Sequence, residues 1–216
     1  MTNGSWRRSA GEAHPQDVQG FRHGRVPRAV RAQQLLDCAE ALFVEHGLDG
    51  VSVEDICRAA EVSRPVFYDH FGSRTGAYIA CVRRIRQEFQ EGLLGLMRVA
   101  ESADLATVFR VAGEAFFTLI EQAPHRWAML YPAMGLSRES ADQLESLREE
   151  TVQTLVVLIR TRLPEFSTTD AMVAAQMISG GGEQLGRWWL RHRDEASRDE
   201  VIDAYQRYAT AALLGM

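Results

Sequence analysis

Lysine is absent from this chain of 216 residues, so all 24 basic residues are arginines. Cysteine is also scarce, with Cys38, Cys57 and Cys81 odd in number and well separated. That pattern argues against a disulfide framework and against a zinc site. The three cysteines fit a reduced interior, in which cysteine behaves as a small buried residue.

Long apolar runs are missing as well. No run approaches the roughly 18–20 apolar residues that a helix needs to cross a bilayer. Residues 1–20 hold no continuous apolar segment of the kind that a secretory signal peptide contains. These absences predict a cytoplasmic protein with no membrane partner. The hydrophobic content of 46% is nevertheless sufficient for a packed core and excludes a disordered chain.

No stretch shows the alternation of period two that marks a β-strand. Apolar residues instead recur at three- and four-residue spacing from about residue 27 onward. Start and stop signals divide this pattern into about nine helices, so we expect an all-α fold. The expected helices begin at Pro27 or Arg28, twice within residues 51–71, near Arg74, after Asp104, at Pro124, at Leu136 or Ser137, after a Thr168 or Thr169 cap, and after Ser197.

Residues 51–71 hold two of these helices with a very short break between them. Ser52 is a good cap for the first, and Asp55 three residues later resembles a loose capping box. Ser63 caps the second, whose first turn contains Pro65, where a missing N–H costs nothing. Two short helices joined so tightly have the form of a helix-turn-helix, a unit that needs other helices to complete its core.

The net charge of −5 argues, taken alone, against a nucleic-acid partner. The distribution of charge matters more, because a basic patch suffices for binding. Arg22, Arg25, Arg28 and Arg31 lie within residues 21–36, which contain no acid. Beside a helix-turn-helix, this basic stretch favours DNA over a purely solubilising role.

The second helix of a helix-turn-helix enters the major groove with its first residues at the base edges. This rule places Arg64, Pro65, Val66 and Asp69 at or near the bases. Arginine can bind guanine through two hydrogen bonds, and valine can contact a thymine methyl group. Asp69 would accept from cytosine or repel phosphate, and the alternative of a plain solvated residue stays open.

Phosphate contacts are expected around the same helices. A serine at a helix N-terminus offers both a hydroxyl and a backbone N–H to a phosphate, which selects Ser52 and Ser63. Arg25, Arg28 and Arg74 are expected to add charge-based phosphate contacts.

The segment ALFVEHGLDGVSVEDICRAAEVSRPVFYDHFGSR, residues 41–74, resembles the tetracycline-repressor (TetR) family of one-component transcriptional regulators. Residues 1–24 show no sustained periodicity, so we expect a flexible arm there. The resemblance implies a DNA-binding domain at residues 25–72 and a ligand-binding and dimerisation domain at 73–216. It also implies that Tyr68 and His70 contact phosphates, although His70 could be a simple surface or capping residue. The family usually has glycine where this chain has Glu61, so a positive φ there would cost about 1–2 kcal/mol.

Large apolar side chains occur at helical spacing throughout the second half, a pattern that usually marks an ordinary core. The resemblance implies that some of them line a cavity for a small apolar or aromatic effector. The candidate lining residues are Phe116, Trp127, Tyr131, Leu147, Thr151, Leu155, Met177 and Trp188. Thr151, Tyr131 or His125 would supply a polar contact.

The helix expected up to about His192 carries a face of small residues that includes Ala175, Ser179, Gly182 and Gly186. Two such helices can approach closely, and with Tyr205 of the last helix they predict a four-helix homodimer interface. The alternative is that these glycines only lie near bulky neighbours or bend the helix.

These observations predict a homodimeric repressor that a small effector releases from a palindromic operator in double-stranded DNA. No metalloprotease motif, nucleophile elbow, dinucleotide fingerprint or carboxylate pair stands out, so we expect no catalytic residues, no metal and no cofactor. A helical ligand-binding or adaptor protein that has lost sequence-specific DNA binding is the alternative.

Overall fold

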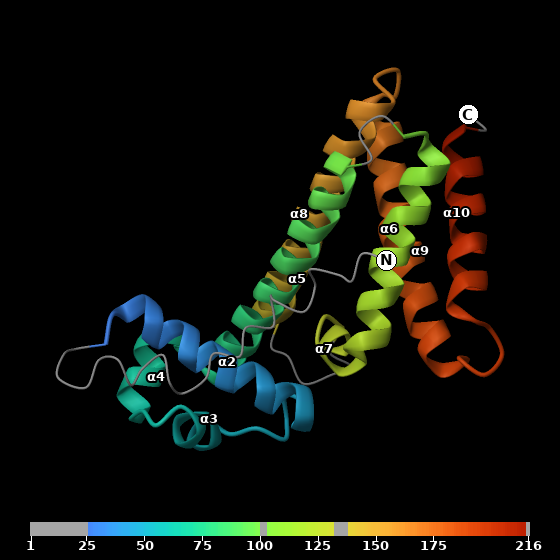
Figure 1. Ribbon diagram of the computed structural model, residues 1–216. Helices are drawn as coiled ribbons and strands as arrows, with labels where there is room; N and C mark the ends of the chain where they lie inside the picture. The colour runs from blue at the N-terminus through green and yellow to red at the C-terminus, as the bar shows by residue number, and fades with distance from the viewer. Residues whose placement is uncertain (1–25, 100–102, 132–137, 215–216) are drawn as a thin grey trace. The chain divides into compact units, whose positions relative to one another are not determined.

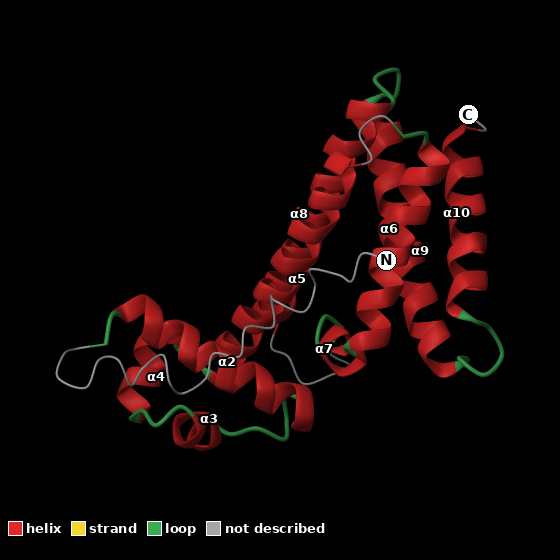
Figure 2. Ribbon diagram, in the orientation of Figure 1, coloured by secondary structure: helices red, strands yellow, loops and turns green. Residues whose placement is uncertain are grey.

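The computed structural model describes residues 26–99, 103–131 and 138–214. Within these ranges the chain forms nine α-helices and no β-strand, which confirms the expected all-α fold (Figures 1 and 2). In the same ranges, no helix has the length and apolar character needed to span a membrane. The helices are α2 (Arg28–His46), α3 (Val53–Ala59), α4 (Arg64–Phe71), α5 (Arg74–Val99), α6 (Leu105–Gln122), α7 (Pro124–Ala128), α8 (Arg138–Arg162), α9 (Thr168–Arg191) and α10 (Arg198–Leu214).

Local sequence signals account for most of the helix ends. Gly47 ends α2 with a φ of 71°, and its N–H donates to the Phe43 carbonyl. Asp104 caps α6 by accepting from the Thr107 N–H. One expected start was wrong, because Ser167 rather than Thr168 or Thr169 caps α9. Ser167 accepts from the Asp170 N–H while the Asp170 carboxylate accepts from the Ser167 N–H, a reciprocal box that a threonine one residue later would not form.

Packing divides the chain into two compact units, with the division inside α5. The first holds α2, α3, α4 and α5 up to Glu88, together with Met129–Ala141. The second holds Phe89–Ala128 and Asp142–Met216. The functional division between residues 72 and 73 stays a prediction.

The core of the first unit joins α2, α3, α4 and the start of α5. Phe43, Ile56 and Phe67, one from each of the first three helices, are at most 1% exposed. From α5, the Tyr78 ring meets Phe43 edge-on at 5.3 Å between centroids, and its hydroxyl donates to the Met129 carbonyl at 2.7 Å. Burial raises the pKa of Tyr78 to about 12, so the hydroxyl keeps the proton that it donates.

An ion network also joins α2 to α5 in this unit. The Arg84 guanidinium lies between Asp37 and Glu40, donating to Glu40 at 2.6 and 2.9 Å and pairing with Asp37. The side chains of Arg84 and Glu40 are only 18% and 12% exposed. Losing one member would leave a largely buried charge uncompensated, so the network fixes the beginning of α5 on α2.

In the second unit α6 packs along α10 and α9, as the ribbon shows (Figure 1). A buried cluster fills the space between α8, α9 and α10, with side chains such as Val152, Ala174 and Leu213. A chain of aromatic contacts runs through α6, where Phe117 meets Phe116 at 5.3 Å and Trp189 of α9 at 5.6 Å. This unit therefore has its own apolar core.

Candidate nucleic-acid interface

The first helix of the predicted helix-turn-helix, α3, begins with a complete capping box. Ser52 accepts from the Asp55 N–H at 3.2 Å, and the Asp55 carboxylate accepts from the Ser52 N–H at 3.0 Å and from its hydroxyl at 2.5 Å. These bonds with Ser52 are the main reason that the pKa of Asp55 is lowered. The capping box is confirmed, while the phosphate contact of Ser52 stays a prediction.

The turn after α3 depends on a left-handed residue. Glu61 has a φ of 53° and is the one non-glycine with positive φ among the described residues. The turn is closed by the Val62 N–H, which donates to the Cys57 carbonyl at 3.0 Å. The position thus has the backbone for which glycine is best suited, and Glu61 adopts it at a cost of about 1–2 kcal/mol.

The second helix, α4, divides its residues between core and surface. Ser63 is the N-cap residue by backbone geometry, but its side chain makes no capping hydrogen bond. Phe67 is fully buried, and Arg64, Pro65, Tyr68 and Asp69 are exposed. Val66 and His70 are half-buried. One face of α4 therefore packs into the core of the first unit. The other face presents the predicted base-reading and phosphate-binding side chains to solvent.

Arginine side chains on this surface are paired with acids. Arg64 Nη1 lies 2.8 Å from Glu54 Oε1, which belongs to the first turn of α3. Arg28 Nη1 lies 2.9 Å from Asp69 Oδ2, and its Nη2 donates to the Asp69 carbonyl at 3.1 Å. A hydrogen bond with Tyr68 and the charge of Glu54 both raise the pKa of Arg64.

Arg74, at the start of α5, contacts the loop before α3. It donates to the Val51 carbonyl at 3.1 Å and lies 3.6 Å from Asp49. Arg25 falls outside the described residues. Glu54 did not enter the sequence-based prediction, because its partner Arg64 lies ten residues away and only the turn between the two helices brings them together.

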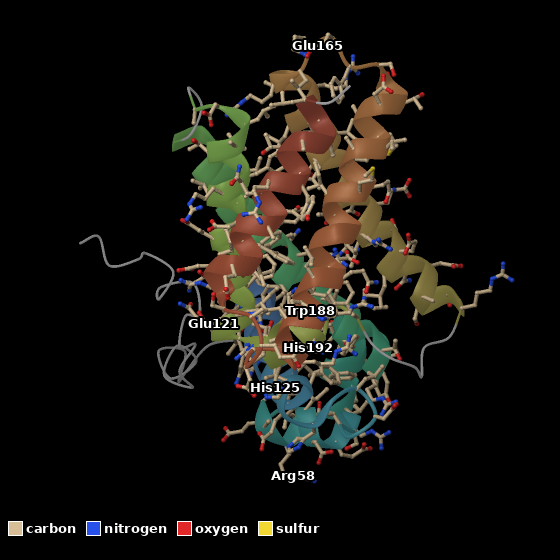
Figure 3. The ribbon with its side chains drawn as sticks, turned by 90° about the vertical axis from the view of Figure 1, so that its right-hand side faces the viewer. Arg58, Glu121, His125, Glu165, Trp188 and His192 are labelled. Atoms are coloured by element: carbon tan, nitrogen blue, oxygen red, sulfur yellow. The ribbon has the colours of Figure 1, made fainter. Side chains whose placement is uncertain are left out.

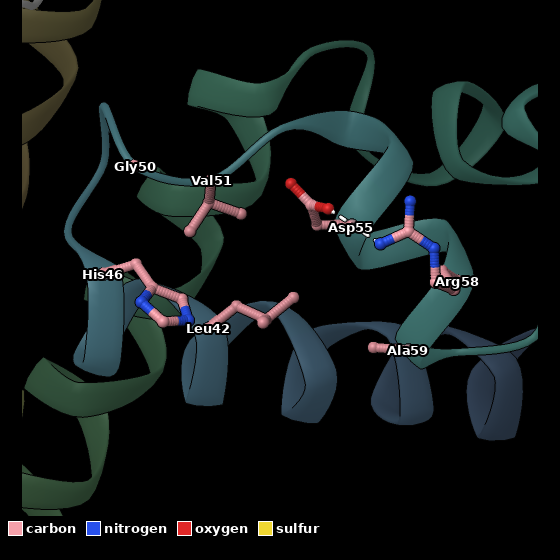
Figure 4. A pocket seen from close by; sticks show the side chains of 7 residues that line it. All are labelled: Leu42, His46, Gly50, Val51, Asp55, Arg58 and Ala59. Carbon is pink, nitrogen blue, oxygen red and sulfur yellow. Dashed lines mark hydrogen bonds and ion pairs between the residues drawn. The ribbon is translucent and has the colours of Figure 1, made fainter.

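A shallow pocket of about 470 Å³ also lies in this unit, between α2 and α3, and opens to solvent (Figure 4). Its polar members are already engaged, since Asp55 belongs to the capping box and pairs with Arg58 at 3.0 Å. We assign no ligand to it. The lining residues are Leu42, His46, Gly50, Val51, Asp55, Arg58 and Ala59.

In the second unit the structure brings together only some of the predicted effector residues. Phe116 and the buried Trp127 meet with ring centroids 6.5 Å apart, and Phe116 also meets Phe89 at 5.6 Å. Thr151 accepts from Gln90 at 3.2 Å and donates to the carbonyl of Leu147, one turn earlier on α8. Leu147 itself is buried and Leu155 is half-buried against the apolar cluster.

Other predicted effector residues lie elsewhere. Met177 is 59% exposed and Trp188 is 38% exposed, so the prediction that they line an interior cavity was wrong. Both side chains lie on the outward face of α9, because eleven residues make about three helical turns. Trp188 stacks on His192 at 5.0 Å near the end of the helix (Figure 3). Tyr131 belongs to the first unit, not to the helices that hold Phe116 and Trp127.

The small face of α9 points into its own subunit, which corrects the predicted dimer interface. Ala175 has no exposed surface, and Gly182 and Gly186 are buried. A Cβ on Gly186 would lie 2.9 Å from Trp127, and one on Gly182 would lie 3.7 Å from Phe116.

The remaining members of the predicted interface are also engaged within the subunit. Tyr205 donates to the Ile178 carbonyl at 3.0 Å, and its burial raises its pKa. Ser179 is half-buried. The small residues therefore allow α6, α7 and α10 to approach α9 closely, which was the alternative interpretation of the glycines.

Comparison with known proteins covers both units. Residues 35–81 match the family model described as bacterial regulatory proteins, tetR family. This range contains α3, α4, most of α2 and the beginning of α5. The match therefore coincides with the candidate interface.

Over most of its length, the chain is similar to the HTH-type transcriptional activator FasR of Mycolicibacterium smegmatis. The two are 26% identical over 205 residues, which cover 94% of this chain and 91% of that protein. An HTH-type transcriptional repressor of Mycobacterium tuberculosis is 32% identical over 75 residues, 32% of this chain and 40% of that protein. Both relatives are transcriptional regulators.

Solved structures have the same fold. A TetR-like transcriptional regulator from Rhodococcus sp. RHA1 is 26% identical, with a TM-score of 0.59 over 89% of this chain and 100% of that one. The regulator FadR from Bacillus subtilis, solved in complex with stearoyl-CoA, is 15% identical, with a TM-score of 0.67 over 85% of this chain and 98% of that one. At that identity, the second likeness shows the fold alone.

Proposed function

Because the chain belongs to the TetR family of transcriptional regulators, we propose that it is a homodimeric repressor of a palindromic DNA operator. Residues 25–72 would bind the DNA, and residues 73–216 would bind an effector and form the dimer. The protein would act in the cytoplasm, where its operator is.

The observation that carries the proposal is the division of α4 between core and surface. Phe67 is buried, while Arg64, Pro65, Tyr68 and Asp69 of the same two turns are exposed. A helix of this length that presents an arginine at its first residue fits the major groove, where arginine reads guanine. Two copies about 34–36 Å apart would read the two halves of a palindrome.

The outward face of α9 supports a homodimer. Val173, Met177 and Trp188 are 48%, 59% and 38% exposed and follow one another at spacings that keep them on one side of the helix. Tyr208 of α10 is 75% exposed. Such large apolar side chains gain from burial against a second copy, so we place the interface on this face of α9 and α10 in place of the small face.

For the effector we propose a molecule with a long acyl chain. Support comes from the aromatic contacts of Phe89, Phe116 and Trp127 in the second unit, which suit an apolar ligand. The fold is also that of Bacillus subtilis FadR, which was solved with stearoyl-CoA. Binding would displace α5, which runs from one unit into the other, and would release DNA through a difference in affinity for the two conformations.

The test is a titration of stearoyl-CoA into the complex of the protein with a fluorescent operator duplex, with free coenzyme A as the matched control. We expect stearoyl-CoA to lower operator affinity and coenzyme A to leave it unchanged. If no acyl compound changes operator affinity, the proposed effector class is wrong. If the protein also binds all DNA sequences equally, the proposed repressor function is wrong, and the adaptor interpretation is favoured.

Activation is a second candidate, because the relative that matches 94% of this chain is named an activator. A chromosomal deletion separates the two. Expression of the adjacent operator-bearing gene should rise if the protein represses it and fall if the protein activates it.

A further inference from the structure

Glu54 is an acid on the surface that is proposed to bind an acidic polymer. It lies in the first turn of α3, and its Oε1 is 2.8 Å from Nη1 of Arg64, the first residue of α4. The two side chains are 49% and 59% exposed, so neither is needed to fill the core. On a surface that only binds phosphates, a carboxylate at this position would weaken binding, because it repels the phosphate charge.

Arg64 is paired across the turn before any DNA arrives. Glu54 approaches it from α3 and forms an ion pair with its guanidinium at 2.8 Å. In the free protein the guanidinium is therefore oriented toward α3. A preorganised donor loses less conformational freedom on binding, and arginine reads guanine only when its planar fork is correctly oriented.

The same arrangement recurs at the other end of α4. Asp69 pairs with Arg28 through its carboxylate and its backbone carbonyl. Both exposed arginines that the described part of this surface offers from α2 and α4, Arg28 and Arg64, are thus compensated by an acid. A surface of this kind attracts a generic phosphate backbone weakly, because each acid repels the phosphates that its arginine attracts.

We propose that Glu54 is a specificity-determining residue, which orients Arg64 for base reading and suppresses binding to DNA that offers Arg64 no acceptor. At the correct site, a guanine would replace Glu54 as the partner of Arg64, and an exposed ion pair is easily exchanged. At any other DNA site, Glu54 would stay paired with Arg64, and its carboxylate would repel the DNA phosphates. This inference rests on the proposed operator-binding function.

The test compares Glu54→Gln with Glu45→Gln, a matched control that removes one exposed negative charge from the end of α2. Each protein is titrated against an operator duplex and a scrambled duplex over a series of salt concentrations. For Glu54→Gln, we expect affinity for the scrambled duplex to rise about three- to tenfold and its salt slope to steepen by about one. Operator affinity should change less, so the ratio of the two affinities falls, while Glu45→Gln keeps the wild-type ratio.

A double-mutant cycle with Arg64→Ala distinguishes orientation of Arg64 from simple charge removal. If Glu54 orients Arg64, Glu54→Gln relaxes preference at one base pair in the wild-type background and changes nothing there in Arg64→Ala. The inference is overturned if both glutamine variants behave alike, or if the affinity ratio of Glu54→Gln equals that of wild type. A wild-type protein that binds both duplexes equally contradicts the operator-binding function itself, and with it the role of Glu54. Matching thermal midpoints verify that the variants are folded.

Discussion

Gly186 of α9 lies directly against the indole ring of Trp127: a Cβ at that glycine would come within 2.9 Å of Trp127 Cζ2. It would also come within 2.7 Å of Ile120 Cδ1. Trp127 is 3% exposed and Ile120 is fully buried, so the ring cannot move aside into solvent. The close approach of α6 and α7 to α9 therefore depends on this glycine.

Gly186→Ala should destabilise the protein by about 1–3 kcal/mol, because overpacking a filled core forces side chains or backbone to shift. Gly180→Ala is the matched control on the same helix, since its Cβ would meet nothing closer than Arg148 at 3.9 Å. That variant should be stabilised by roughly 1 kcal/mol through helix propensity. Urea unfolding measures both, and equal stability of the two variants would contradict the packing described for Gly186.

Glu61→Gly should stabilise the protein by roughly 1 kcal/mol. The φ of 53° at this residue is strained for any side chain with a Cβ, and glycine removes that strain at some cost in unfolded-state entropy. Ala60→Gly is the control, because Ala60 has a φ of −90° and gains nothing from glycine. Thermal unfolding would speak against a strained turn if Glu61→Gly proved less stable than wild type.

The Asp55 capping box makes stability depend on pH. The bonds with Ser52 lower the pKa of Asp55 in the folded state, so the folded protein binds a proton there less readily than the unfolded chain does. This stabilisation is present above the unfolded pKa of about 4 and is lost as pH falls through the lower folded value.

Asp55→Asn should accordingly lower the unfolding free energy at neutral pH and flatten its decline between neutral and acidic pH. Chemical unfolding at a series of pH values measures the effect. Glu45→Gln is the control, since it removes an exposed carboxylate that belongs to no helix cap. Parallel curves for Asp55→Asn and wild type would be inconsistent with the capping role.

Met177→Glu should convert the proposed dimer to monomers, because the charge would be buried at the centre of the outward apolar face of α9. Met177 is 59% exposed in the subunit, so the variant should fold as well as wild type. Gln122→Glu, an exposed position at the end of α6, serves as the control. Analytical ultracentrifugation that shows unchanged dimers for Met177→Glu would place the interface elsewhere.

Local chemistry made the helices predictable from sequence. The Ser52–Asp55 box, the positive φ of Gly47 and the Asp104 cap each depend on residues within four positions of one another, so the sequence pattern contains the whole interaction. The predicted cap of α9, Thr168 or Thr169, differs from the observed Ser167 by only one or two residues. The burial of Phe67 and the exposure of Tyr68 likewise follow from helical phase.

Tertiary partners could not be read in the same way. Small residues at Gly182 and Gly186 predict that something approaches closely, but not whether it is a second copy or, as here, Phe116 and Trp127 of the same subunit. Met177 and Trp188 have the composition of cavity lining and lie on the surface. The pairing of Glu54 with Arg64 needs the geometry of the turn at Glu61, which sequence spacing does not contain.

The most direct test of the central claim is selection of bound sequences from a random duplex library by the full-length protein, repeated at several salt concentrations. We expect one enriched palindrome with half-sites about one helical turn apart, bound more weakly as salt rises. Recovery of no preferred sequence at any salt concentration would contradict it.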